Sequence, residues 1–264
     1  MIERSSKIEI EKKDDWSNHW QSYAKSASEN PAQKMRHQLI LEKVLEFSDR
    51  RELLLDVGSG QGDFLAKAVS LKVAKKYIGF ELSEAGVAIS RNKVKDAFFY
   101  QVDLFSPPVG INVFNNAANI IVCSDVIEHV DDPLLFCKLI LNYLKPGGLL
   151  LLTVPGGPMS SFDRYIGHRK HFNKATISNL LEQAGYSVDA VKMAGFPFFN
   201  LYRLLVILRG SKLIQDAQES KITTSSFMAR ILMKIFGALF KLNLDDSRFG
   251  WQVFAIARNP SSIK

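Results

Sequence analysis

Short apolar runs alternate with amphipathic segments along most of the chain. The apolar runs predict buried strands at 52–57, 76–80, 98–102, 119–124, 149–154, 187–193 and 251–258. Helical spacing predicts helices between them, at 64–70, 83–94, 133–144 and 176–184, and over 16–47 with a break at Asn30-Pro31. Because strands that alternate with helices of this length form βαβ units, the pattern predicts an α/β fold with a seven-stranded sheet.

The interval between the last two predicted strands is too long for a turn. It holds two apolar stretches with helical spacing, 198–208 and 227–242, and the second carries Arg230, Lys234 and Lys241 on one stripe. We therefore divide the chain into an N-terminal arm with covering helices (1–47), an α/β core (48–195), an apolar and basic helical insertion (196–250), and the last strand with a tail (251–264).

Composition narrows the class of protein. Hydrophobic residues make up 47% and charged residues 23%, which is typical of a globular protein rather than a disordered or fibrous one. Cys123 and Cys137 are too few to cross-link 264 residues, which favours a reducing compartment. The charged N-terminus has no apolar leader, and no uncharged apolar run reaches about 18 residues. We expect a cytoplasmic protein.

The net charge of +7 is concentrated near the C-terminus, where 196–264 holds ten lysines and arginines against four acidic residues. An apolar and basic segment suits an acidic lipid surface better than nucleic acid, because no basic run here belongs to a nucleic-acid-binding motif. We predict no nucleic-acid partner. Three interpretations of 196–242 stay open: peripheral contact with the inner membrane face, a homodimer interface, or packing on the sheet.

The most specific motif is a glycine-rich turn after the first strand, in the sequence LLLDVGSGQGDF. Asp56 precedes Gly58 and Gly60, and the G-x-G-x-G spacing differs from the G-x-G-x-x-G of dinucleotide sites. A pyrophosphate would be poorly placed beside Asp56, whereas a cationic or ammonium-bearing ligand would be well placed. About 20 residues on, Glu81 ends the second strand, where a carboxylate can accept both hydroxyls of a ribose. Asp103, near the end of the third strand, could accept an adenine amino group.

The segments LLLDVGSGQGDF, FEL, QVDLF, CSDVIEHV and LKPGGLLLLTVP occur in an order that resembles the class I S-adenosylmethionine-dependent methyltransferases. The resemblance implies a Rossmann-like sheet with an antiparallel last strand, S-adenosyl-L-methionine bound over the strand C-termini, and in-line methyl transfer. It also implies cofactor-binding roles for Arg36, Asp56, Gly58, Gly60, Glu81, Leu82, Asp103, Leu104 and Ser124. Among these, Arg36 corresponds to a contact with the methionine carboxylate, and Leu104 to a residue stacking beside the adenine.

The segment 124–130 is similar to the Glu-x-x-Glu-His motif of the ubiquinone-biosynthesis O-methyltransferases. In that subgroup the three polar residues are implicated in metal binding. Here the first is Asp125, one carbon shorter, and we expect no metal. We interpret Glu128 as a cap or ion-pair residue at a helix start, and His129 as a catalytic residue that accepts a hydroxyl proton.

A second polar cluster, 163–172, follows the fifth strand, and loops at this edge of an α/β sheet face the ligand crevice. We assign His168 a catalytic role, and Tyr165 and Arg169 roles in acceptor binding. His171 is interpreted as part of the cap of the next helix. A zinc site is not expected, because neither cysteine has ligand spacing to these histidines.

The sequence thus predicts an S-adenosylmethionine-dependent methyltransferase that acts on an oxygen of a small or lipid-linked acceptor. Three alternatives remain at this level: an N- or C-methyltransferase, a non-catalytic cofactor-binding scaffold at a membrane surface, and a nicotinamide dehydrogenase, which the glycine spacing disfavours. Acceptor chemistry depends on the pocket and is not fixed by the fold.

Overall fold

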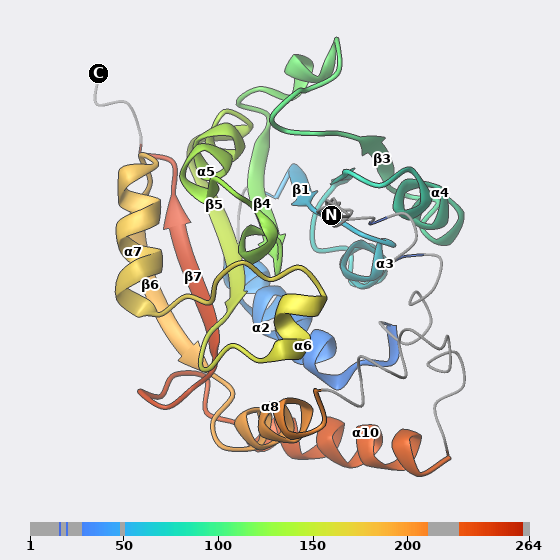
Figure 1. Ribbon diagram of the computed structural model, residues 1–264. Helices are drawn as coiled ribbons and strands as arrows, with labels where there is room; N and C mark the ends of the chain where they lie inside the picture. Colours follow the sequence, from blue (N-terminus) through green and yellow to red (C-terminus); the bar gives the residue numbers. More distant parts are fainter. Residues whose placement is uncertain (1–15, 17–19, 21–27, 48–50, 211–226, 261–264) are drawn as a thin grey trace, which may run out of the picture.

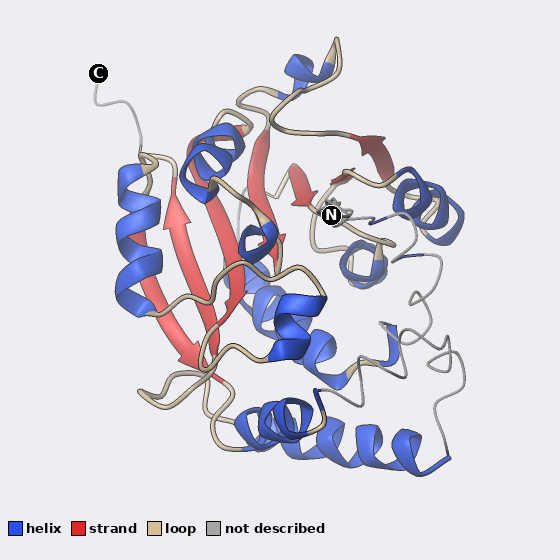
Figure 2. Ribbon diagram, viewed as in Figure 1, coloured by secondary structure: helices blue, strands red, loops and turns tan. Residues whose placement is uncertain are grey.

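The computed structural model describes residues 16, 20, 28–47, 51–210 and 227–260. A seven-stranded sheet with the order β3-β2-β1-β4-β5-β7-β6 lies at its centre (Figures 1 and 2). The strands are β1 (Leu53–Val57), β2 (Lys76–Glu81), β3 (Phe98–Gln101), β4 (Ala118–Ser124), β5 (Leu144–Pro155), β6 (Ser187–Ala194) and β7 (Gln252–Arg258). Neighbours among β1–β5 pair in parallel, and β7 is antiparallel to both β5 and β6. This confirms the predicted α/β fold with its Rossmann-like sheet and reversed last strand.

Helices cover both faces of the sheet. One face packs against α2 (Pro31–Glu46), α3 (Asp63–Ser70) and α4 (Glu84–Lys93), the other against α5 (Pro133–Leu141) and α7 (Lys174–Gln183). Side chains of β4 alternate between the faces: Ile120 and Val122 join the first core, whereas Ile121 and Cys123 join the second. Burial on both sides explains why the central strands read as unbroken apolar runs.

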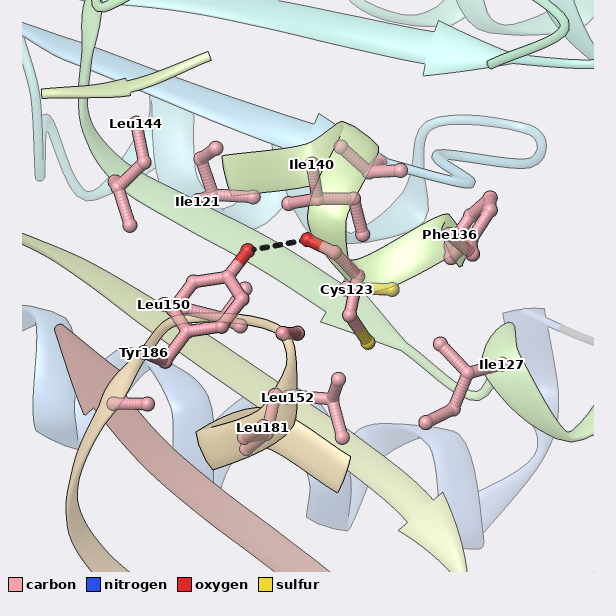
Figure 3. Close-up of a cluster of buried hydrophobic side chains, with 14 of the residues drawn as sticks. Ile121, Cys123, Ile127, Phe136, Ile140, Leu144, Leu150, Leu152, Leu181 and Tyr186 are labelled. Carbon is pink, nitrogen blue, oxygen red and sulfur yellow. Dashed lines mark hydrogen bonds between the residues drawn. The ribbon is translucent and has the colours of Figure 1, made fainter. Parts of the chain in front are cut away.

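The core between β4, β5, α5 and α7 contains both cysteines as free thiols (Figure 3). The hydroxyl of Tyr186 donates a 2.9 Å hydrogen bond to the carbonyl of Cys137 across this core. Burial raises the pKa of Cys137 to about 12, so its thiol stays neutral. Cys123 and Cys137 therefore act as small apolar core residues.

The predicted break at Asn30-Pro31 marks the start of α2. The side chain of Asn30 accepts a hydrogen bond from the amide of Ala32 at 2.9 Å, and Pro31 occupies the first turn, where its missing N–H costs nothing. Ile40, Leu41 and Val44 then pack against the sheet. This fixes the direction in which α2 crosses the sheet and so places Arg36 near the strand C-termini.

The helix predicted over 133–144 is shorter in the structure. Helix α5 ends at Leu141, and β5 begins at Leu144, so that 145–148 lies inside a strand rather than a helix-terminating loop. Leu144 pairs with Ala118, and the register then shifts until Ile120 pairs with Leu149. Gly147, at φ +74°, allows this irregularity. Pairing with β4 overrides the turn signal carried by proline and glycine.

The insertion forms α8 (Phe198–Leu208) and α10 (Phe227–Leu239), followed by a 3-10 turn at Phe240–Leu242, which confirms both predicted helices. The two helices lie together along one edge of the molecule (Figure 1). They pack on α2 through a small apolar cluster that contains Ala32, Phe199, Phe236 and Phe240. Among the described residues, no helix combines the length and hydropathy needed to cross a bilayer.

Candidate cofactor and acceptor site

The turn between β1 and α3 is a tight glycine loop, as predicted. Gly58 and Gly60 have φ angles of +74° and +53°, in the left-handed region that favours glycine. A Cβ on Gly58 would overlap the side chain of Val126, and one on Gly60 would lie 2.6 Å from the ring of Trp20. The amide of Gly58 donates to the carbonyl of Phe80 at 2.8 Å, which ties the loop to the end of β2.

Two buried carboxyl groups stand beside this loop. Asp56, in β1, is 3% exposed, and burial together with the Glu81 charge raises the pKa of Asp56 to about 8. Glu81, at the end of β2, accepts hydrogen bonds from the amides of Gly60 at 2.8 Å and Ser83 at 2.9 Å. Burial raises the pKa of Glu81 despite these donors. A ligand that brings positive charge or hydroxyl donors would relieve the cost of burying both groups.

The remaining residues predicted to bind the cofactor occupy different environments. Leu82 is 48% exposed just beyond β2. Asp103 lies two residues beyond β3, where its exposed carboxylate accepts from the amide of Phe105 at 2.9 Å and closes a turn. Leu104 does not line this surface, because its side chain is buried in the core. Ser124, at the end of β4, shares a 2.8 Å hydrogen bond with the hydroxyl of Thr153 on β5.

Arg36 reaches the same edge of the sheet from α2. Its Nε lies 2.7 Å from Oδ2 of Asp125, the residue that follows β4. Oδ1 of Asp125 accepts from the hydroxyl of Thr153 at 3.2 Å and the amide of Gln252 at 3.3 Å. Asp125 has a φ of +53°, a conformation that Asp and Asn tolerate better than most residues. The ion pair holds the arginine beside the loop that carries Glu128 and His129.

Glu128 corrects our interpretation of that loop. Its side chain is fully buried, and in the part of the chain that the structure describes neither carboxyl oxygen has a partner with hydrogen-bond geometry. It is therefore not a helix cap. Nε2 of His129 lies 3.9 Å from its Oε1. Burial and the neighbouring Asp125 carboxylate raise the pKa of Glu128 well above its ordinary range.

Three histidines meet behind this loop. The rings of His129 and His168 are 4.7 Å apart and perpendicular, and Nδ1 of His168 lies 3.2 Å from Nε2 of His171. His171 also hydrogen-bonds the carbonyl of Gly157 at 3.1 Å, so it does not cap α7; the cap is Asn173. Burial and the nearby His129 lower the pKa of His168 to about 3, which keeps its imidazole neutral at neutral pH.

The histidine loop is anchored by an ion pair that the sequence did not indicate. Asp163, fully buried in α6 (Ser161–Tyr165), accepts two hydrogen bonds from Arg203 of α8, at 2.9 and 3.0 Å. Ser160 also donates to this carboxylate from its amide and hydroxyl. These donors lower the pKa of Asp163 to about 2 although burial opposes them. The partners lie far apart in sequence, so no local pattern could have revealed them.

Tyr165 and Arg169 differ in how they face the site. The side chain of Tyr165 is 45% exposed at the end of α6. Nε of Arg169 lies 3.1 Å from Asp131, and its backbone amide donates to the carbonyl of Glu128 at 2.8 Å. Arg169 therefore joins the loop after β4 to the loop after β5, and its guanidinium is already engaged by a carboxylate.

A family model described as a methyltransferase domain matches residues 32–191, which contain the glycine loop and both histidine-bearing loops. The chain belongs to the class I S-adenosylmethionine-dependent methyltransferases. This confirms the family and the cofactor predicted from the motifs.

Two curated relatives and one solved structure illustrate the similarity. A Mycolicibacterium smegmatis protein named "probable S-adenosylmethionine-dependent methyltransferase" is 26% identical over 166 residues, 58% of this chain and 59% of its own length. A ubiquinone biosynthesis O-methyltransferase of Acinetobacter baumannii is 29% identical over 117 residues, 43% of this chain and 48% of its length. The chain thus spans about half to three-fifths of these relatives. Phosphoethanolamine N-methyltransferase 2 of Haemonchus contortus, in complex with S-adenosyl-L-methionine, shares the fold with a TM-score of 0.52 at 20% identity, over 82% of this chain and 51% of that one.

The residues around the glycine loop fit this cofactor. The backbone at Gly58 and Gly60 leaves no room for a Cβ, and Asp56 and Glu81 supply buried carboxylates for an ammonium or sulfonium charge and for ribose hydroxyls. Trp20, which sequence reasoning missed, lies over Gly60, and the ring of Trp16 meets that of His129 edge-on at 4.7 Å. Two tryptophans four positions apart in the N-terminal segment were the only available signal.

Two groups of side chains in the described residues have ligand atoms close enough to hold a cation. They are Glu128 with His129 and His168, and Asp163 with His168 and His171; within each group the ligand atoms lie within 4.8 Å of one another. Arg203 already neutralises Asp163, which disfavours the second set. The first set joins one carboxyl to two imidazoles, a donor combination suited to a transition-metal ion. The expectation that no metal binds here stays a prediction.

Proposed function

We propose that this chain transfers a methyl group from S-adenosyl-L-methionine to an oxygen atom of a small or lipid-linked acceptor. The observation that carries the proposal is the contact between Val126 and Gly58, which seats the loop bearing His129 directly against the glycine turn. The methyl donor and a proton-accepting side chain would therefore meet at one edge of the sheet. When bound, the cofactor supplies a methyl group on a positively charged sulfur that needs no further activation.

The cofactor-binding roles follow from position and charge. We assign the methionine end to Asp56, Gly58 and Gly60, and the ribose hydroxyls to Glu81. Arg36 would bind the methionine carboxylate, held ready by Asp125. Asp103, exposed beyond β3, would accept the adenine amino group, with Leu82 beside the ribose edge. Leu104, being buried, would support the adenine pocket from beneath rather than by stacking.

Of the two predicted catalytic histidines, we assign proton removal to His129 and a positioning role to His168. His129 lies on the loop that touches the glycine turn, with Glu128 3.9 Å from its Nε2. The perpendicular ring of His168, fixed by His171, restricts the orientation of His129. Tyr165 and Arg169 would face the acceptor from the second loop. A general base contributes roughly 10²–10⁴-fold to such a step.

Similarity to a ubiquinone biosynthesis O-methyltransferase supports an oxygen acceptor, and a phenol with a lipid tail is the class that this name suggests. That similarity covers 43% of this chain, so the preference for a lipid tail is a separate proposal. A nicotinamide dehydrogenase is set aside, because the chain belongs to the methyltransferase family.

The test has two stages. Calorimetric titration with S-adenosylhomocysteine should show binding that is lost in Asp56→Ala and Glu81→Ala. Transfer of a radiolabelled methyl group should then be measured to a phenol with a polyprenyl tail, the same phenol without a tail, and a primary amine. We expect His129→Ala to lose roughly 10²–10⁴-fold in phenol turnover, with partial rescue by added imidazole.

Two results would contradict the proposal. Transfer to the amine that is unaffected in His129→Ala would indicate an N-methyltransferase. Tight S-adenosylhomocysteine binding without transfer to any of the three acceptors would favour a non-catalytic cofactor-binding protein.

A further inference from the structure

Four leucines on α8 form an exposed apolar stripe. Leu204 and Leu205 lie three and four residues after Leu201 and four and three residues before Leu208, so the four leucines share one face of the helix. Their exposed fractions run from 36% for Leu205 to 72% for Leu208. The opposite face is apolar too, because Phe199 packs in the cluster with α2 and α10. Helix α8 is therefore hydrophobic on its outer side without that side being needed for the core.

Helix α10 extends this surface. Leu232 and Ile235 are 43% and 50% exposed, and Leu242 of the following turn is 66% exposed. Phe236 and Phe240 point the other way, into the cluster that holds α8 and α10 on α2. Figure 1 shows the two helices together along the lower edge of the molecule. Exposed leucine and isoleucine side chains thus gather along this edge.

The same edge is positively charged. Arg230, Lys234 and Lys241 are exposed along α10 and the turn after it, and Arg209 is exposed at the end of α8. The sequence has no aspartate or glutamate within 198–210 or 227–242. Apolar and basic stripes on paired helices that cannot span a bilayer are typical of a surface that lies in the membrane interface.

We propose that α8 and α10 dock on an anionic phospholipid surface. The leucines of α8 and the apolar side chains of α10 would enter the boundary between headgroups and acyl chains. Arg230, Lys234 and Lys241 would lie among the phosphates, where anionic lipid attracts each cation. Among the described residues, none of these three basic side chains forms an ion pair, and an acidic headgroup layer would supply the counter-charge.

The charge on this surface favours lipid over a second copy of the chain as its occupant. A symmetric dimer through this edge would bring the same patch of both protomers together. The basic residues of both protomers, Arg230, Lys234 and Lys241, would then share one interface, with no acidic residue in either helix to balance them. Like charges at such an interface oppose association. The apolar stripe alone fits a dimer, but the stripe with its basic flank fits the lipid.

The proposed docking surface is also connected, through α8, to the loop that we propose faces the acceptor. Arg203 lies between the exposed leucines of α8 in sequence, yet its side chain turns inward to Asp163. Asp163 in turn lies against His168, 3.9 Å from its Nδ1. A lipid-linked acceptor would therefore leave the bilayer beside its site; this link rests on the proposed function, whereas the docking itself does not.

The experiment uses the full-length chain and flotation with two kinds of vesicle: pure phosphatidylcholine, and phosphatidylcholine with about 30% phosphatidylglycerol. We expect binding to the anionic vesicles that weakens as salt is raised. Leu204→Ser/Leu208→Ser and Arg230→Glu/Lys234→Glu should each reduce it about tenfold or more. Matched controls change exposed residues elsewhere: Leu71→Ser/Leu135→Ser and Lys95→Glu/Lys174→Glu should bind like the unaltered protein.

Binding of S-adenosylhomocysteine and the thermal unfolding midpoint should be unchanged in every variant, which shows that the fold is kept and separates this test from that of methyl transfer. Equal vesicle binding by the α8 and α10 variants and their controls would overturn the proposal. So would failure of the unaltered chain to float with anionic vesicles. A concentration-dependent dimer that only Leu204→Ser/Leu208→Ser dissociates, without vesicle binding, would assign the surface to a second copy.

Discussion

Arg36 and Asp125 form an ion pair, with 2.7 Å between Nε and Oδ2, that links helix α2 to the loop after β4. Both side chains are largely buried, and the carboxylate is braced from β5 and β7 by Thr153 and Gln252. The guanidinium is thus pre-oriented at the edge of the sheet where we propose that the cofactor binds. Preorganisation of this kind lowers the entropy lost when a ligand carboxylate is bound.

Loss of Arg36 should weaken cofactor binding more than loss of its ion-pair partner Asp125. Arg36→Met removes a charge-assisted hydrogen bond, so we expect the Kd for S-adenosylhomocysteine to rise roughly ten- to hundredfold in calorimetry. Asp125→Asn keeps a residue that tolerates φ +53° and should raise the Kd far less. Equal losses in the two variants would show that the arginine acts only through the ion pair.

The glycine turn allows a control for backbone strain. Gly58→Ala adds a Cβ that overlaps Val126 at φ +74°, whereas Gly110→Ala adds one at φ +90° with no atom within 4 Å. Each should cost about 1–2 kcal/mol from the left-handed backbone, measured by urea unfolding. Only Gly58→Ala should also abolish S-adenosylhomocysteine binding. Retained binding in that variant would place the cofactor elsewhere.

Asp56 should make the ligand-free protein less stable as the pH rises. Its pKa is about 8 in the folded chain against an ordinary value of 3.8, so the folded state holds this proton more tightly than the unfolded state. The stabilisation is complete below pH 4 and is lost as pH rises towards and through 8. Asp56→Asn removes this dependence, and its thermal midpoint should exceed that of the unaltered protein at pH 8 by about 2–4 °C for each kcal/mol gained.

The same variant should fail to bind S-adenosylhomocysteine, because the amide offers no negative charge to the ammonium group. Scanning calorimetry at pH 5 and pH 8, with and without this ligand, separates the two effects. A thermal midpoint for Asp56→Asn that equals that of the unaltered protein at both pH values would contradict the pH prediction.

The Asp163–Arg203 pair predicts the opposite pH dependence. Asp163 has a pKa of about 2, below its ordinary 3.8, so it contributes stability that is present above pH 4 and is lost as pH falls through 2. Arg203→Met leaves a buried carboxylate without its cation and should cost about 3–5 kcal/mol in urea unfolding near neutral pH. Asp163→Asn/Arg203→Met, which removes both charges, should recover part of that loss. A double variant no more stable than Arg203→Met would show that the pair is not coupled.

The central strands were predictable because they are buried on both faces, so an unbroken apolar run marks β1, β2, β4 and β7 within about one residue. Helix α8 was predicted to the residue, since proline before it and glycine after it bound one apolar stretch. The end of α5 was wrong because the pairing of Leu144 with Ala118 extends β5 through a proline–glycine sequence that normally stops an element.

Some features of the candidate site could be predicted from the sequence, and others could not. Asp56, Gly58 and Glu81 were visible because the chemistry of a turn between strand and helix is local. The contacts between the two polar loops were not: the amide of Arg169 donates to the carbonyl of Glu128, and the rings of His129 and His168 meet, only because the folded sheet brings these loops together. Arg203 lies 40 residues from Asp163, and no local pattern indicated that the two side chains pair.

Helix α2 contacts both surfaces for which a binding role is proposed. Arg36 projects from it to the cofactor edge, while Ala32 and Met35 belong to the cluster beneath α8 and α10. The first turns of α2 thus connect the proposed cofactor edge to the helices that we propose dock on lipid. Thermodynamic linkage then makes the two binding events reciprocal: whatever factor vesicle contact applies to cofactor affinity, cofactor must apply to vesicle affinity. The fraction of the protein that is bound to membrane and the fraction that holds cofactor would then depend on each other.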